Sequence, residues 1–284
     1  MRSYLKKKPI LSAFLILLIA FILRLNDLFI LKIDELLGEI IVSKTLGFLL
    51  VILFVTQIKE PFSSIGLHKK NLWFCIFLGL LMNLGIYLLA YGIEYSVLLF
   101  SKQGPNLMFT AIDPKQGVNG GALFGIWLIA GNIINALMEE GLFRGVFLPT
   151  FKTRYSFWKA NLFQALLFGL WHWVWPLKSF LTGEQSMLGA LMNALILMLG
   201  TATFGFVWGY MFQKTNSLWT SIAAHFAANT IQNILHINSN NGVDTMVFLR
   251  GTFASLFGIA CIFLIKRITT KYKLPALKAW GVTE

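Results

Sequence analysis

Residues 121–144 read GALFGIWLIAGNIINALMEEGLFR, and this stretch decides the fold. It is apolar enough to lie in a membrane, yet two adjacent glutamates, Glu139 and Glu140, interrupt it near its end. A charged side chain at the centre of a membrane-spanning helix costs about 2.5–3.5 kcal/mol on insertion scales, so such residues are retained mainly where they face the protein interior and have a function. We therefore expect the function of this chain to depend on these two carboxylates.

The composition indicates that the whole chain is membrane-embedded. Hydrophobic residues make up 57% of the 284 positions and charged residues 13%, whereas a soluble domain has about 25% charged residues. A spanning helix needs ~20 mostly apolar residues. The sequence therefore predicts an all-α, polytopic membrane protein with about eight transmembrane helices, near 10–26, 45–58, 72–98, 121–150, 157–177, 187–212, 216–237 and 245–265. The first apolar run has no small-residue cleavage site after it, so we expect a retained helix rather than a signal peptide.

The chain shows no internal repeat, low-complexity tract or long soluble segment. We expect residues 1–284 to form a single membrane domain with its catalytic core at about 121–235. The net charge of +12 is distributed unevenly: with the N-terminus inside and eight spans, sixteen Lys and Arg lie on the inner side and five on the outer side. The positive-inside rule then places both termini in the cytoplasm, in the plasma membrane if the cell is prokaryotic. The basic excess indicates contact with anionic lipid of the bilayer and not with nucleic acid.

The fourth predicted span carries three charged residues with different expected partners. Glu140 and Arg144 are four residues apart, share a helix face and are expected to form a structural ion pair. Glu139 points about 100° away from Glu140 and has no partner on its own helix. A buried carboxylate of this kind suits a general base or acid. The alternative is that both glutamates only bond neighbouring helices.

Two further predicted spans carry histidines at membrane depth. Phe168 lies one turn before His172, so its ring is expected to pack against the imidazole; the alternative is an interfacial aromatic belt with an incidental histidine. His225 and Asn229 are four residues apart and can both donate hydrogen bonds into one cavity. The alternative for them is a pair of weak interhelical contacts. His236, at the end of this span, is expected to be solvated.

Three helices thus bring one Glu, two His and one Asn to membrane depth. A carboxylate and an imidazole can activate water by general-base chemistry. A second imidazole and an amide can donate to an oxyanion in a water-poor cavity. Because no Ser or Cys nucleophile with a base at suitable spacing is evident, the set indicates hydrolysis of a peptide bond by direct attack of water.

The motifs Glu139-Glu140-x-x-x-Arg144, Phe168-x-x-x-His172 and His225-x-x-x-Asn229 resemble those of a known family. This is the type II CAAX prenyl endopeptidase and bacteriocin-processing family, also called CPBP or Abi, of intramembrane glutamic proteases. The resemblance covers about 121–235. It implies that Glu139 and His172 activate the water, that His225 and Asn229 form the oxyanion hole, and that Glu140 and Arg144 hold the helix. It further implies a peptide or membrane-associated protein substrate, prenylated or not. We expect neither cofactor nor metal, because a pair of oxyanion donors is present and a zinc signature is not.

Three other functions remain open at this point. A zinc-dependent membrane protease would use Glu139, His172 and His225 as ligands, although no His-Glu-x-x-His signature is present. A bacteriocin self-immunity protein would act by binding a peptide without cutting it. A proton-coupled transporter would use buried Glu and His as a relay, but the chain shows no matched pair of broken helices.

Overall fold

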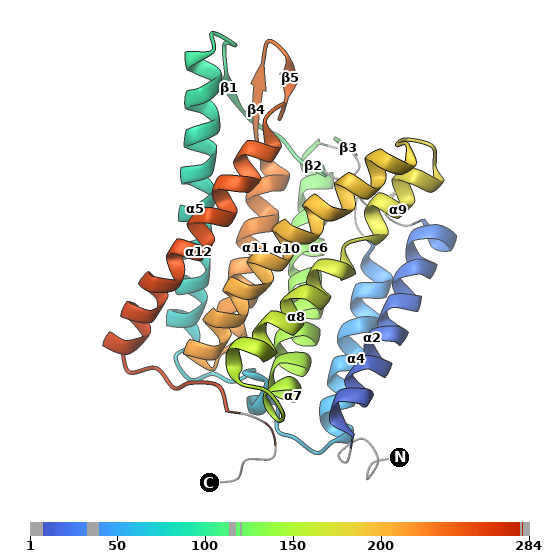
Figure 1. Ribbon diagram of the computed structural model, residues 1–284, viewed down its shortest axis with the longest axis vertical. Helices are drawn as coiled ribbons and strands as arrows, with labels where there is room; N and C mark the ends of the chain where they lie inside the picture. Colours follow the sequence, from blue (N-terminus) through green and yellow to red (C-terminus); the bar gives the residue numbers. More distant parts are fainter. Residues whose placement is uncertain (1–7, 33–39, 114–117, 120, 279, 281–284) are drawn as a thin grey trace.

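The computed structural model describes residues 8–32, 40–113, 118–119, 121–278 and 280, and most of them are helical (Figure 1). The all-α, polytopic fold class is therefore confirmed. The α-helices are α2 (Pro9–Asn26), α4 (Ile41–Gln57), α5 (Leu72–Phe100), α6 (Gly121–Glu140), α7 (Leu148–Lys152), α8 (Phe157–Trp171), α9 (Val174–Leu181), α10 (Met187–Thr215), α11 (Leu218–Ile234) and α12 (Val247–Lys271). Two π-helices, η1 (Asp27–Leu31) and η3 (Gly141–Phe147), continue α2 and α6, and η2 (Phe62–Ile65) is a 3₁₀ turn.

Within the described residues, five helices are long and apolar enough to cross a membrane. They are Pro9–Leu31, Leu72–Phe100, Phe124–Lys152, Met187–Thr215 and Val247–Lys271. The segment Ile41–Gln57 is a shorter apolar helix. The expected spans 157–177 and 216–237 contain helices of 15 and 17 residues, which are shorter than a full crossing. The eight expected apolar segments are thus all helical in their central parts, but they differ in length.

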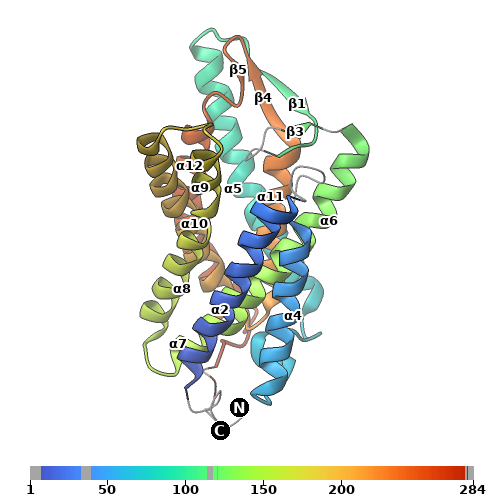
Figure 2. The same cartoon turned by 90° about the vertical axis from the view of Figure 1, so that its right-hand side faces the viewer.

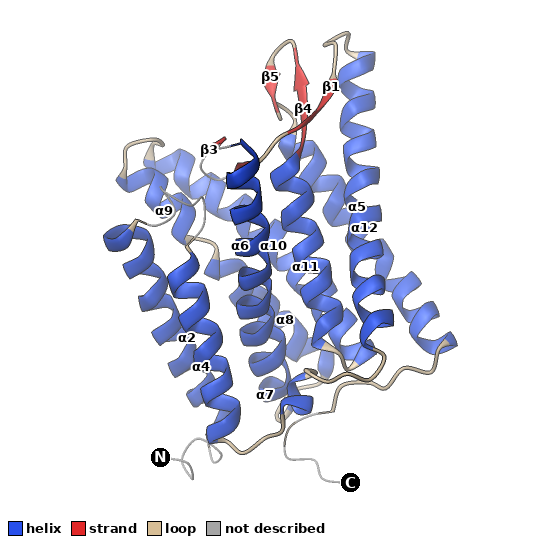
Figure 3. Ribbon diagram, turned by 180° about the vertical axis from the view of Figure 1, so that it is seen from behind, coloured by secondary structure: helices blue, strands red, loops and turns tan. Residues whose placement is uncertain are grey.

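A small sheet lies at one end of the helix bundle, beside the end of α5 (Figure 3). Its strands are β1 (Asn106–Phe109), β4 (Leu235–Ser239) and β5 (Gly242–Val243), antiparallel in the order β1-β4-β5. A second pair joins β2 (Ile112–Asp113) to β3 (Val118–Asn119). The helix expected over 216–237 therefore ends at Ile234, because the chain then pairs with β1.

His236 lies in this sheet and is buried, so the prediction that it is solvated is wrong. Its Nδ1 atom lies 2.7 Å from Oδ2 of Asp244. Asp244 reaches it because β5 and the turn after it fold back along β4. Arg250 of α12 pairs with the same carboxylate, at 2.9 Å from Oδ1. The sheet, the turn and the start of α12 are thus joined by one buried ionic cluster.

Helix α11 packs against α5, α6 and α10. Gly79 of α5 faces the backbone of Thr220, where a Cβ atom would clash. Small residues of this kind allow membrane helices to approach closely. In the same interface the Asn83 amide donates a hydrogen bond to the carbonyl of Ala224. Helix α5 therefore fixes the position of the α11 turn that carries His225.

Helices α2 and α4 lie side by side on one face of the bundle (Figure 2). They are joined where α4 begins, because the backbone N–H of Ser43 donates to Oδ2 of Asp27 at 2.7 Å. The N-terminus of a helix favours an anion at this position. The first turn of α2 and the last turn of α12 lie at the same end of the bundle (Figure 1).

Candidate active site

Glu139 and Glu140 are the last two residues of α6, where the helix changes to the π-helix η3. Short π segments occur frequently at functional sites. All side chains from Met138 to Phe151 are buried. The ion pair expected from the sequence forms despite the change of helix type, with Arg144 Nε 3.2 Å from Glu140 Oε2. The guanidinium of Arg144 also lies over the ring of Phe168, at 4.2 Å from its centroid.

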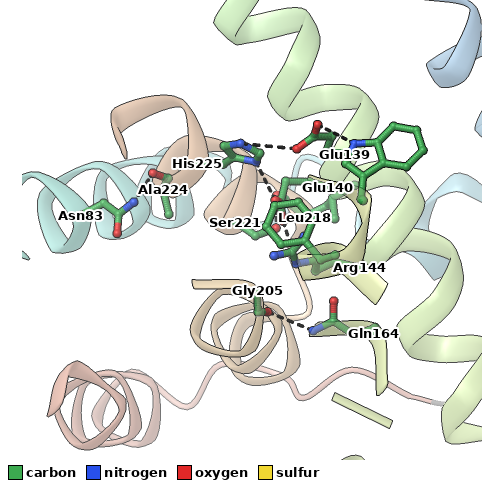
Figure 4. Close-up of polar contacts among 12 residues, drawn as sticks. Asn83, Glu139, Glu140, Arg144, Gln164, Gly205, Leu218, Ser221, Ala224 and His225 are labelled. Carbon is green, nitrogen blue, oxygen red and sulfur yellow. Dashed lines mark hydrogen bonds and ion pairs between the residues drawn. The ribbon is translucent and has the colours of Figure 1, made fainter. Parts of the chain in front are cut away.

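Glu140 has a second partner that the sequence did not predict (Figure 4). Nδ1 of His225 lies 2.8 Å from Glu140 Oε1. An ionised carboxylate only accepts hydrogen bonds, so this Nδ1 carries the proton. The indole of Trp208 on α10 stacks on the imidazole at 4.5 Å between centroids. Glu140 and Trp208 therefore fix the ring of His225 so that its Nε2 faces Glu139, at 3.8 Å from Oε2.

His172 follows the last residue of α8, where the span expected over 157–177 is broken. The break has a local cause: Pro176 cannot donate to the carbonyl of His172, and its ring would clash there in a continuous helix. Nδ1 of His172 lies 2.7 Å from the carbonyl oxygen of Phe168. A carbonyl only accepts, so Nδ1 is protonated and a neutral ring has its lone pair on Nε2. Nε2 lies 3.9 Å from Glu139 Oε2.

The expected packing of Phe168 against His172 is present, with centroids 4.8 Å apart in an edge-to-face arrangement. Phe168 also lies edge-to-face against His225, at 5.9 Å. One phenyl ring thus contacts both imidazoles and the guanidinium of Arg144.

Glu139 is held by two residues that are not among the fixed positions of the three motifs. Nε1 of Trp171 donates to Oε1 at 2.9 Å, and Nη1 of Arg24 lies 3.6 Å from the same oxygen. The partners that hold Oε1 of Glu139 thus come from α2 and α8, and none is found among the described side chains of its own helix. The only signal for Arg24 was the cost of an arginine at the end of an apolar run. Trp171 was one of several tryptophans and carried no specific signal.

Asn229 lies one turn beyond His225 on α11 and is partly exposed. Its side chain makes no hydrogen bond to another residue in the described ranges. Asn132, on the face of α6 that carries Glu139, donates to Asn233 of α11 at 3.0 Å. The face of α6 that carries Asn132 and Glu139 therefore lies along α11.

The three motifs lie on α6–η3, on α8 with the residue after it, and on α11. Their two histidines approach one buried carboxylate, that of Glu139. Residues 121–231 match the family model described as type II CAAX prenyl endopeptidase, Rce1-like. The resemblance indicated by the motifs is thus confirmed for this part of the chain. At the level of the family, the Rce1-like match supports a hydrolase that is a CAAX-protease-like intramembrane endopeptidase. No curated protein and no solved structure matches the chain.

The Rce1-like stretch does not contain the whole of the observed site, because Arg24 lies on α2, outside residues 121–231. Over the described residues, no group of three or more His, Cys, Asp or Glu side chains is arranged to hold a metal ion. The distances of 3.8 and 3.9 Å from Glu139 Oε2 to the two imidazole nitrogens are too long for direct hydrogen bonds. They are lengths that one bridging water molecule can span, and its two hydrogens can be donated to two of these three acceptor atoms at once.

Proposed function

We propose that this protein is an intramembrane endopeptidase in which Glu139 and His172 activate a water molecule for attack on a peptide bond. The observation that supports this best is the approach of His172 Nε2 and His225 Nε2 to the same oxygen, Glu139 Oε2, in a buried site. A water between them lies within reach of a carboxylate and of an imidazole lone pair, which is the arrangement that general-base catalysis requires.

The proton transfers follow from the tautomer of His172. Its Nδ1–H remains bonded to the carbonyl of Phe168, so only Nε2 exchanges protons during the reaction. As the water oxygen bonds to the scissile carbonyl carbon, its proton passes to Glu139 or to Nε2 of His172. The same group then returns the proton to the departing amine nitrogen as the carbon–nitrogen bond breaks.

We propose that His225 and Asn229 donate hydrogen bonds to the oxyanion that forms when the scissile carbonyl is attacked. Because Nδ1 of His225 already donates to Glu140, Nε2 can donate as well only when the ring is doubly protonated. The amide of Asn229 is a neutral donor one turn away on α11. Donors held in a site that excludes water stabilise a developing negative charge more strongly than they would in solution.

The substrate class is a peptide or a membrane-associated protein, which reaches the buried site from the bilayer or its surface. The resemblance to CAAX proteases favours a prenylated C-terminal segment, and an unprenylated leader peptide is the alternative. We place both chain termini in the cytoplasm, on the distribution of basic residues.

The test is a cleavage assay on the purified full-length protein, with three peptides: a farnesylated CAAX-like peptide, the same peptide without farnesyl, and a leader-type peptide. We expect cleavage at one bond, identified by product mass, no cleavage by Glu139→Gln, and full activity after treatment with a strong zinc chelator. Activity lost to the chelator and restored by stoichiometric zinc would show a zinc protease instead. Peptide binding without any product would favour an immunity protein.

A further inference from the structure

We propose that Arg24, on α2, is a positioning residue of the active site that holds Glu139 as an ionised carboxylate with its Oε2 atom turned to the two histidines. The proposal rests on the proposed function for the chemistry that this carboxylate performs. The contact itself is a property of the structure: Arg24 is the partner of Glu139 in a buried ion pair, and both side chains are almost fully inaccessible.

The two oxygens of Glu139 have separate surroundings. Oε1 receives the indole N–H of Trp171 at 2.9 Å and lies 3.6 Å from Nη1 of Arg24. Oε2 faces Nε2 of His172 and Nε2 of His225, and accepts no hydrogen bond from the described residues. One hydrogen bond from Trp171 and the ion pair with Arg24 fix this oxygen, and this sets the direction of the other. Arg24 and Trp171 therefore determine where the reactive oxygen points.

Helix α2 is built to hold the guanidinium in this place. The guanidinium carbon of Arg24 lies 4.4 Å from the centroid of the Trp171 ring and 6.0 Å from that of Trp175. A guanidinium over an indole face is a favourable cation–π contact, stronger when desolvated. Phe21, one turn earlier on α2, packs edge-to-face on the same Trp171 ring at 5.9 Å. The chain after Arg24 is anchored to α4 through Asp27.

The charges near Glu139 explain why an arginine is needed. Glu140 and Arg144, next along the helix, pair with each other. Among the described residues, the charged or titratable groups that lower the energy of an ionised Glu139 include His172, His225, Arg24 and, from α4, the buried Lys44. A buried carboxylate that loses its ion-pair partner is strongly destabilised. Arg24 remains charged at every working pH, so it can keep Glu139 ionised while the histidines change their protonation.

The first experiment needs no substrate and so stands apart from the proposed function. Melting temperatures are measured for the full-length wild type, Arg24→Gln, Glu139→Gln and the double variant. We expect each single change to lower the melting temperature. Arg24→Gln should lower it much less in the Glu139→Gln background than in the wild type. The matched control is Arg250→Gln, another buried arginine that pairs with Glu94 and Asp244. Arg250→Gln should lower the melting temperature by the same amount in both backgrounds. If Arg24→Gln also lowered it by the same amount in both, the proposal would be overturned.

The second experiment measures peptide cleavage as a function of pH. Arg24→Gln should lower kcat on the order of tenfold at neutral pH with little change in KM, because part of the general-base contribution is lost. The acidic limb of its pH–kcat profile should move to higher pH, so that activity recovers in alkaline buffer. Arg24→Lys, which keeps the charge, should retain the wild-type profile. Arg24 would be only a packing residue if the pH–kcat profile of Arg24→Gln did not move. The same conclusion would follow if the Gln and Lys variants lost kcat equally. The two tests can also disagree. If the melting temperatures show that Arg24 and Glu139 interact but the protein cleaves no peptide, the ion pair is supported and only the proposed function is refuted.

Discussion

Glu140 links two functional side chains, because it pairs with Arg144 and accepts the Nδ1 proton of His225. Glu140→Gln should therefore lower the melting temperature, since breaking one partner of a buried pair costs about 3–5 kcal/mol. It should also lower kcat, because the His225 ring loses the acceptor that orients it. The measurements are thermal unfolding and cleavage kinetics. Glu184→Gln, at an exposed position, is the control and should match the wild type in both. A Glu140→Gln protein with wild-type stability would contradict this role.

His225 and Asn229 should act on the transition state and not on substrate binding. Removing one oxyanion donor typically lowers kcat ~10²–10³-fold. Each alanine variant should therefore lose kcat with KM nearly unchanged, and the double variant should lose less than the product of the two. Asn233→Ala is the control on the same helix, since its side chain bonds Asn132 and lies about two helical turns beyond His225. Changes in KM alone would place the two residues in substrate binding.

At the scale of the elements, the sequence predicted contacts that are local. The Glu140–Arg144 pair and the packing of Phe168 on His172 follow from a spacing of four residues, and both are present. The contacts that it missed join distant segments. The strand at Leu235–Ser239 forms because it pairs with Asn106–Phe109. Helical periodicity carries no information about such a partner.

The same limit applies to the candidate site. Arg24 and Trp208 reach the site from α2 and α10, far from the motifs in the sequence. The break after Trp171 is different, since Pro176 was a visible local signal for it. The sequence did not predict the hydrogen bond that forms at this break, between Nδ1 of His172 and the carbonyl of Phe168.

The turn between β5 and α12 should stabilise the end of the bundle that carries the sheet, through Asp244. Burial raises the pKa of Asp244, but hydrogen bonds from His236 and Arg250 outweigh this and lower it from 3.8 to about 2. A lowered carboxyl pKa adds stability above the unfolded value, and this stability is lost as the pH falls towards about 2. Asp244→Asn should therefore lower the melting temperature at pH 7, and the difference from wild type should shrink below the unfolded pKa. A pH-independent difference would contradict the role of the charge.

At the scale of the whole molecule, we expect the orientation of the bundle in the membrane to follow from the distribution of its basic residues. Lys152, Arg154 and Lys159 lie at or near the turn between α7 and α8, on the side that the positive-inside rule assigns to the cytoplasm. In a functional variant without Cys75 and Cys261, a cysteine at exposed Ser156 should resist an impermeant thiol reagent added to intact cells. A cysteine at exposed Asn241, in the turn between β4 and β5, should react. The opposite pattern would invert the topology and place the termini outside.

The extent of the catalytic unit is also a property of the whole molecule. A core over about 121–235 remains a prediction, and the family match covers 121–231 of it. The contact between Arg24 and Glu139 adds α2 to the residues that shape the site. We therefore expect the complete chain, and not the matched stretch alone, to be the unit that cleaves peptide.

The central claim is that Glu139 is the carboxylate that activates water, and kcat of Glu139→Gln tests it most directly. The assay uses purified, monodisperse protein and the peptide that the wild type cleaves, with Glu184→Gln as the matched control. We predict that kcat falls ~10²–10⁴-fold or below detection, the contribution expected of a general base, while the protein remains folded by thermal unfolding. A folded Glu139→Gln protein that keeps kcat within about tenfold of the wild type would contradict the account. If folded Glu140→Gln were inactive at the same time, the two glutamates would have exchanged roles.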